Sequence, residues 1–88
     1  MKIEITSKFS KQLGSCTNTR VKGKVAYIIG LVINSNSLVN IQNVKKLKGT
    51  KNYYSIRIGS YRIGIVKEGE CVIFAAFDKR SDIYKYFP

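Results

Sequence analysis

The sequence predicts an α+β fold, and three observations lead to this class. A short alternating stretch opens the chain, two segments with helical spacing follow it, and the C-terminal half contains three strand-like runs separated by tight turns. Helices and antiparallel strands that are segregated along the chain are typical of α+β proteins. At 88 residues, the chain has the length of one domain, 1–88, around a single modest core.

The first half of the chain contains a strand and two helical segments. Residues 2–6, KIEIT, alternate between polar and apolar side chains, as a half-buried strand does. Ser7 is placed to cap a helix that ends near Gly14, after about two turns. A second helix start follows at 17–19, and apolar residues then recur at helical spacing at Val21, Val25, Ile29 and Val32. Because Gly23 and Gly30 weaken a helix, a buried strand over YIIGLVI stays open as the alternative.

The segment from 34 to 52 is predicted to be a connection that contains a turn of helix. NSNS at 34–37 is a polar break, and the apolar residues after it follow no single period. Its end carries a lysine cluster, made of Lys45, Lys46, Lys48 and Lys51. Such a cluster is either a solvated surface or a phosphate-binding patch, and in this sequence the two interpretations have equal weight.

The C-terminal half predicts a three-stranded antiparallel meander with strands at 53–58, 61–67 and 71–77. Gly59-Ser60 and Glu68-Gly69 both suit two-residue hairpin turns. The remaining residues, from 78 to 88, form a short closing hook that contains Arg80 and Tyr84.

The first turn sets a register that can be counted outward. Arg57 then lies opposite Arg62, and Ser55 lies opposite Gly64, on one face of the hairpin. The other face is the core face, formed by Tyr54, Ile56, Ile58, Tyr61, Ile63 and Ile65. Like charges directly opposite on a sheet are destabilising, and small neighbours leave room beside them, so this face predicts a shallow cationic recess for a phosphate. In the alternative, the two arginines splay apart on a solvated face.

Counting through the second turn extends the recess to the third strand. Ala75 is expected opposite Arg62 and Ile73 opposite Gly64, which would make an apolar floor. Arg80 and Tyr84 follow the end of that strand, where an aromatic ring beside arginines would hold an unstacked RNA base. Packing of the hook is an equally good explanation of Tyr84.

Charge is the strongest signal in the composition. Sixteen Lys and Arg against five Asp and Glu give a net charge of +11, which favours a polyanionic partner such as nucleic acid, a ribosome or an acidic protein. The longest apolar run is too short to span a membrane, and two isolated cysteines suit a reduced, cytoplasmic protein.

The residue types restrict the chemistry. The chain has no histidine, its acidic residues are scattered, and it contains no phosphate-binding glycine motif, so we expect no metal and no cofactor. RNA carries its own nucleophile, the 2′-hydroxyl, so basic residues alone can promote its cleavage by stabilising charge on the phosphate. A metal-independent ribonuclease is therefore consistent with this composition.

Two stretches resemble the RelE/ParE superfamily of toxin–antitoxin toxins. They are VKKLKGTKNYYSIRIGSYRIGIV and VIFAAFDKRSDIYKYFP, with the LKG before a strand, the arginine-bearing hairpin and the closing R-x-D-I-Y as the matching features. The resemblance implies two N-terminal helices packed on a small twisted, mainly antiparallel sheet with a short C-terminal hook. It also implies an acidic antitoxin, and, for the RelE branch, cleavage of mRNA on the ribosome.

Carried over by position, the resemblance assigns roles to named residues. Arg57 and Arg62 match phosphate-contacting and transition-state-stabilising residues, Arg80 matches a supporting arginine, and Tyr84 matches the tyrosine that holds the nucleotide. The lysine cluster would dock on ribosomal RNA.

One position departs from the RelE pattern. Ser55 stands where a family lysine is a candidate general base, so Lys48 or Lys51 would have to replace it. The departure also leaves two other functions open. One is a ParE-like inhibitor of DNA gyrase, and the other is a degenerate toxin that only binds its antitoxin.

Overall fold

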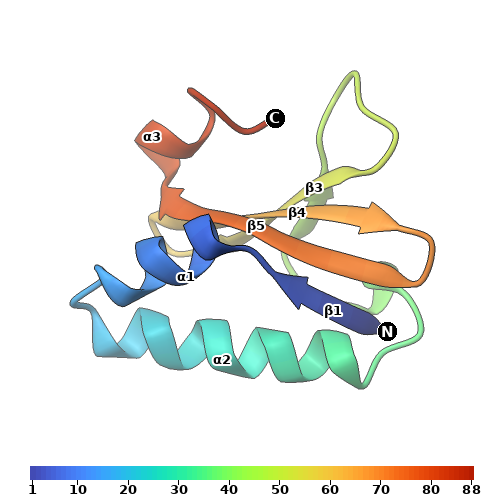
Figure 1. Cartoon of the computed structure of the whole chain (residues 1–88), viewed down its shortest axis with the longest axis horizontal. Coiled ribbons are helices and arrows are strands. Elements are labelled where there is room, and N and C mark those ends of the chain that lie inside the picture. The colour runs from blue at the N-terminus through green and yellow to red at the C-terminus, as the bar shows by residue number, and fades with distance from the viewer.

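The computed structural model describes residues 1–88 as a five-stranded sheet with helices on both faces (Figure 1). In chain order the elements are β1 (Lys2–Ile5), α1 (Ser7–Gly14), α2 (Thr19–Ile33), the 3₁₀ turn η1 (Leu38–Asn40), β2 (Val44–Lys46), β3 (Tyr53–Ile58), β4 (Tyr61–Glu68), β5 (Cys71–Lys79) and α3 (Arg80–Ile83). None of the helices is long and apolar enough to cross a membrane. The predicted α+β class is confirmed.

The strand order is β1-β5-β4-β3-β2, with only the β1–β5 pair parallel. Helices α1 and α2 cover one face of the sheet, while α3 and the loop between β2 and β3 rise from the other (Figure 1). The helix predicted after residue 17 is confirmed as α2, and the strand alternative for this segment is wrong. Asn18 caps the helix through its side-chain oxygen, which accepts a hydrogen bond from the Val21 amide.

Three sequence-based details are corrected by the structure. The cap of α1 is Thr6 and not Ser7, because Thr6 keeps an extended backbone and its Oγ1 accepts a hydrogen bond from the Phe9 amide. The connection after α2 contains β2, which pairs with β3. A strand of three residues is too short to show an alternation of apolar and polar side chains in the sequence. The turn between β4 and β5 lies one residue later than predicted, at Gly69-Glu70 and not at Glu68-Gly69.

The later turn, together with a β-bulge between Gly64 and Ile65, shifts β5 against β4. Arg62 therefore lies opposite Asp78, and not opposite Ala75 as predicted. Gly64 lies opposite Ala76, and not opposite Ile73. The predicted register of β3 and β4 is confirmed at every position, including the cross-strand pair of Arg57 and Arg62.

The sheet buries apolar side chains on both faces, but unequally. The main core lies under α1 and α2 and includes Phe9, Val25, Val32, Ile56, Ile63, Ile65, Val72 and Phe74, each at most 1% exposed. A small second cluster of Ala76, Ile83 and Phe87 lies under the C-terminal hook on the opposite face. The hook is thus held by apolar burial of its own, with Phe87 also 5.5 Å from Tyr53 between ring centroids.

Gly64 is a point of close contact between the hook and the sheet. A Cβ at this position would lie 2.7 Å from two ring carbons of Phe87. The absence of a side chain therefore allows the ring to lie directly on β4. The sequence interpretation that Gly64 leaves open room beside the arginines is wrong, because Phe87 fills it.

We expect Gly64→Ala to lower the free energy of unfolding by about 1–3 kcal/mol, because Phe87 must move away from the strand. Gly30→Ala is the matched control. A Cβ on Gly30 in α2 meets nothing within 4 Å, so alanine should raise stability by about 0.5–1 kcal/mol through helix propensity. Urea unfolding measures both. Equal effects of the two substitutions would contradict this account of the Phe87 contact.

Candidate functional site

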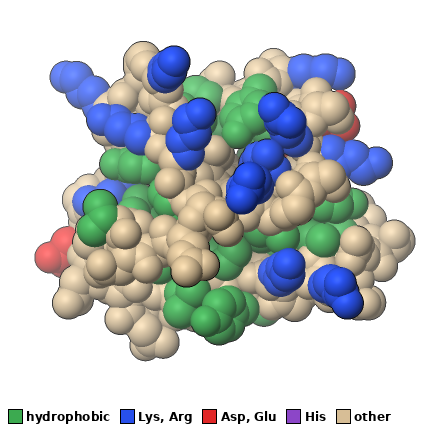
Figure 2. Space-filling view, turned by 180° about the vertical axis from the view of Figure 1, so that it is seen from behind, with side chains coloured by type: hydrophobic (Ala, Val, Ile, Leu, Met, Phe, Trp, Pro, Cys, Tyr) green, Lys and Arg blue, Asp and Glu red, His purple; other side chains and the backbone are tan.

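A hollow of about 480 Å³ lies between β2, β3, β4 and α3, and we call it the central hollow. Its ten lining residues are Asn43, Val44, Lys45, Leu47, Lys48, Ser55, Arg57, Arg62, Arg80 and Tyr84. The structure therefore brings together all four residues predicted for catalysis, which come from β3, β4, α3 and the residue after it. None of the five acidic residues lines the hollow. From behind, the molecule shows Lys and Arg over its upper half, its centre and its lower right, with acidic side chains only at the margins (Figure 2).

The Arg62 side chain is oriented by the turn beside it. Its Nη1 donates to the carbonyl oxygens of Gly59 (2.8 Å) and Tyr61 (2.9 Å). A guanidinium has five N–H groups, so Nε and Nη2 keep three donors for a ligand. The Gly59 carbonyl has this position because Gly59 adopts a φ of 57°, which the tight turn requires.

Arg57 is held from the opposite side of the hairpin. Its Nη2 donates to Oδ1 of Asn43 at 3.5 Å, and Asn43 precedes β2 with a φ of 65°, which asparagine tolerates. The two cross-strand arginines thus have separate anchors, as the splayed interpretation expects. They nevertheless line the same hollow, as the recess interpretation expects. Separate anchors reduce the mutual repulsion that direct opposition would otherwise cause.

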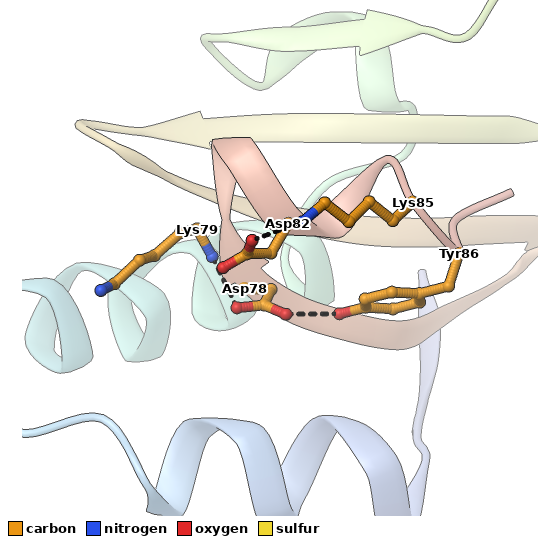
Figure 3. Close-up of polar contacts among 5 residues, drawn as sticks. All are labelled: Asp78, Lys79, Asp82, Lys85 and Tyr86. Atoms are coloured by element: carbon orange, nitrogen blue, oxygen red, sulfur yellow. Dashed lines mark hydrogen bonds and ion pairs between the residues drawn. The ribbon is translucent and has the colours of Figure 1, made fainter.

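Asp78 lies opposite Arg62 in the register but does not neutralise it. Its Oδ1 accepts from the Lys79 amide at 2.8 Å, and its Oδ2 accepts from the Tyr86 hydroxyl at 3.0 Å (Figure 3). The ion pair present in the structure joins Lys85 to Asp82 at 3.4 Å, near the chain end. The acidic residues nearest to the arginines therefore have their partners in the hook, and none of them forms an ion pair with Arg57, Arg62 or Arg80.

Tyr84 is held by a contact that the sequence did not reveal. Its hydroxyl donates to Oγ of Ser55 at 3.1 Å, while the residue as a whole stays 45% exposed. Ser55 is 4% exposed and is the only buried polar residue. The register alone placed Ser55 on this face, but its partner comes from the hook, 29 residues away, which no local pattern indicates.

Helix α1 reaches the hook through Gln12. The Gln12 side chain accepts from the Phe77 amide at 2.9 Å and donates to the Tyr86 hydroxyl at 2.6 Å, so its amide orientation is defined. The Nζ of Lys8 lies over the Tyr86 ring, 3.7 Å from the ring centroid. Burial raises the pKa of Tyr86, and its hydrogen bond to Asp78 adds to that rise, against the opposing effect of the Gln12 donor. These contacts fix the segment that presents Arg80 and Tyr84.

The predicted lysine cluster is divided by the structure. Lys45 and Lys48 line the central hollow, whereas Lys46 lies beside a separate hollow with Tyr54 and Lys67. The division follows from the alternation of β2, because Lys45 pairs with Ser55 and Lys46 with Tyr54. Lys51, in the loop between β2 and β3, is exposed and lines none of these hollows.

Comparisons with known proteins give consistent relatives. The chain is 40% identical to Toxin RelE3 of Methanocaldococcus jannaschii over 89 aligned residues, covering 100% of both chains. It is 38% identical to a chain in the crystal structure of the RelB–RelE antitoxin–toxin complex from Methanococcus jannaschii, with a TM-score of 0.81 and 97% and 99% of the two chains covered. YafQ from E. coli shares the fold, at 19% identity, a TM-score of 0.73 and 94% and 97% coverage. No protein-family model matches the chain.

The Tyr86 contact predicts a pH-dependent stability. We expect Tyr86→Phe to lower the free energy of unfolding at pH 8 by roughly 0.5 kcal/mol, the low end for a hydrogen bond, because the residue is 38% exposed. The pKa of Tyr86 is raised in the folded state. The hydroxyl therefore contributes fully below about pH 10, the unfolded value, and its contribution is lost as the pH rises through the folded value.

Urea unfolding from pH 7 to pH 11 measures this difference between wild type and variant. The difference should be constant near neutrality and shrink above about pH 10. Tyr27→Phe, at a ring that is 67% exposed on α2, is the control and should leave the free energy of unfolding at pH 8 unchanged. A Tyr86→Phe difference that grows with pH would contradict the assigned direction.

Proposed function

This chain belongs to the RelE family of toxins from toxin–antitoxin systems, and we propose that it is a metal-independent, ribosome-dependent mRNA endonuclease that inhibits translation in the cytoplasm. The observation that carries the proposal is the central hollow, in which three arginines and an exposed tyrosine ring meet without an acidic neighbour. Such a site suits a single-stranded polyanion with accessible bases.

In the proposed reaction, the 2′-oxygen of the RNA attacks the adjacent phosphorus. A bond forms between the 2′-oxygen and phosphorus as the 2′-hydroxyl proton passes to a base, and the bond from phosphorus to the 5′-oxygen breaks. The 5′-oxygen takes up a proton from water, which leaves a cyclic phosphate and a 5′-hydroxyl. The three free donors of Arg62 are suited to the negative charge that develops on the phosphate oxygens. Arg57 and Arg80, on the same hollow, add to the favourable potential.

The reaction also needs a group that accepts the 2′-hydroxyl proton and a surface that holds the nucleobase. Of the two lysines that could replace the missing family lysine, Lys48 lines the central hollow and Lys51 does not, so we assign the acceptor to Lys48. Tyr84 would stack on a base through its exposed ring, while Ser55 holds its hydroxyl. Lys45, Lys46 and Lys51 would contact ribosomal RNA.

We assign an acidic antitoxin as the second partner. A net charge of +11 and an arginine-lined hollow without acidic residues favour an anionic protein that covers the site. The relative from Methanococcus jannaschii was crystallised as an antitoxin–toxin complex. The ParE-like alternative, inhibition of gyrase, is not favoured, because the full-length relative is a RelE toxin.

The decisive test is expression of the chain without an antitoxin. We expect growth arrest and new mRNA 5′ ends at ribosomes, with plasmid supercoiling unchanged. Arg62→Ala should lower cleavage by about 100-fold to 1,000-fold, the usual loss when one stabilising donor is removed. Lys2→Ala, an exposed lysine on β1, is the charge-matched control and should cleave like wild type.

Other outcomes identify the alternatives. Loss of supercoiling with intact mRNA would indicate a gyrase inhibitor, and absence of toxicity would indicate a protein that only binds an antitoxin. Arg62→Ala with wild-type cleavage would overturn the assigned site even if the chain is a ribonuclease.

Tyr84 gives a separate prediction about the role of its ring. Tyr84→Ala should weaken cleavage by about 5-fold to 150-fold, the equivalent of one lost base–aromatic stack. Tyr84→Phe keeps the ring and loses only the hydrogen bond to Ser55, so it should retain most activity. Cleavage assays with purified ribosomes measure both. If the two variants are equally impaired, the hydroxyl and not the ring carries the function.

A further inference from the structure

A second hollow adjoins the central one, and we call it the flanking hollow. It has a volume of about 610 Å³ and seven lining residues, Gly59, Ser60, Arg62, Lys79, Arg80, Ser81 and Tyr84. Arg62, Arg80 and Tyr84 line both hollows, so these three side chains separate them. Lys79, Ser60 and Ser81 have no role in the cleavage site described above.

The flanking hollow has the chemistry of an anion site. Its lining contains three cationic side chains and three hydroxyl groups, from Ser60, Ser81 and Tyr84, and no carboxylate. The two acidic residues nearest in sequence have other partners, because Asp78 accepts from Tyr86 and the Lys79 amide, and Asp82 pairs with Lys85. The Lys79 side chain carries three donors and is exposed, so an anion can reach it.

The walls of the flanking hollow are tied to each other. The Arg80 amide donates to the Ser60 carbonyl at 2.8 Å, which joins the start of the hook to the β3–β4 turn. Lys79 ends β5 opposite Tyr61 and also lines a hollow beside α1 with Gln12 and Asp78, so its side chain extends from the strand end between that hollow and the flanking one. The backbone around the flanking hollow is therefore fixed at a paired strand end and its turn, while the exposed Lys79 side chain is free to reach a ligand.

We propose that the flanking hollow binds the RNA phosphate next along the strand from the one that is cleaved, with Lys79 as its principal cation. The inference rests on the proposed ribonuclease function, which it deepens. A strand that places one phosphate among Arg57, Arg62 and Lys48 must continue past the ridge of Arg62, Arg80 and Tyr84. On the far side it meets Lys79, which supplies a positive charge for a phosphate, and the Ser60 and Ser81 hydroxyls, which supply hydrogen-bond donors.

The test uses 2′-O-methyl RNA, which has no free 2′-hydroxyl and cannot be cleaved by this route. Binding of a labelled tetranucleotide and a labelled dinucleotide to the purified chain is followed by fluorescence anisotropy across a salt series. For Lys79→Gln we expect about three- to tenfold weaker tetranucleotide binding at low salt, and a slope of log affinity against log salt reduced by about 0.7, the value for one single-strand phosphate. Dinucleotide binding, with one phosphate, should stay unchanged.

The controls separate this inference from the proposed function. Lys2→Gln removes the same charge elsewhere and should leave both affinities at the wild-type value, while Lys79→Arg should restore tetranucleotide binding. Arg62→Ala should weaken both oligonucleotides, and if it weakens neither, the cleavage site itself is misplaced.

One result overturns only the flanking site. If Arg62→Ala weakens binding but Lys79→Gln leaves the tetranucleotide affinity and salt slope unchanged, the next phosphate does not lie in this hollow. In that case, loss of poly-glutamate binding in Lys79→Gln would assign the hollow to an acidic protein partner. Lys79 is exposed, so an unchanged thermal unfolding midpoint confirms that each variant is folded.

Discussion

The two-residue turn at Gly59-Ser60 organises the arginines of this protein. It sets the register that places Arg57 opposite Arg62, and its Gly59 carbonyl accepts from the Arg62 guanidinium. The Ser60 carbonyl accepts from the Arg80 amide and so fixes the start of the hook. One tight turn, allowed by a glycine with a φ of 57°, therefore positions three cations from three elements. A change in loop length here would move all three at once.

The two faces of the sheet divide stability from binding. The face under α1 and α2 contains the main apolar core, so the other face can carry groups that oppose folding. Cross-strand arginines cost some fraction of about 1 kcal/mol, whereas each fully buried isoleucine or phenylalanine contributes about 1.5–3 kcal/mol. Part of the second face is also apolar, under Ile83 and Phe87, and this patch holds the hook against the sheet. The open part of that face is left with the arginines, Ser55 and Tyr84.

The acidic residues near the site have structural roles in the hook. Asp78 accepts a hydrogen bond from the Tyr86 hydroxyl, and Asp82 forms an ion pair with Lys85. Gln12 of α1 donates to the same Tyr86 hydroxyl. Because these carboxylates have other partners, they form no ion pair with Arg62 or Arg80, although Asp78 lies opposite Arg62 in the sheet. A helix on one face of the sheet thus supports the segment that completes the site on the other.

The sequence by itself determined the first helix, the three strands of the meander and the β3–β4 register, because each depends on a local period or on the length of one turn. For α2 it left a strand alternative open. It also indicated Arg57, Arg62, Arg80 and Tyr84, which are four of the ten residues that line the central hollow. The tertiary structure alone decided the rest. The three-residue strand β2 gains its identity only from pairing, the bulge after Gly64 sets Asp78 opposite Arg62, and the alternation of β2 separates Lys45 from Lys46. The contact of Tyr84 with Ser55 and the fit of Phe87 on Gly64 join residues far apart in the chain, so only long-range packing could establish them.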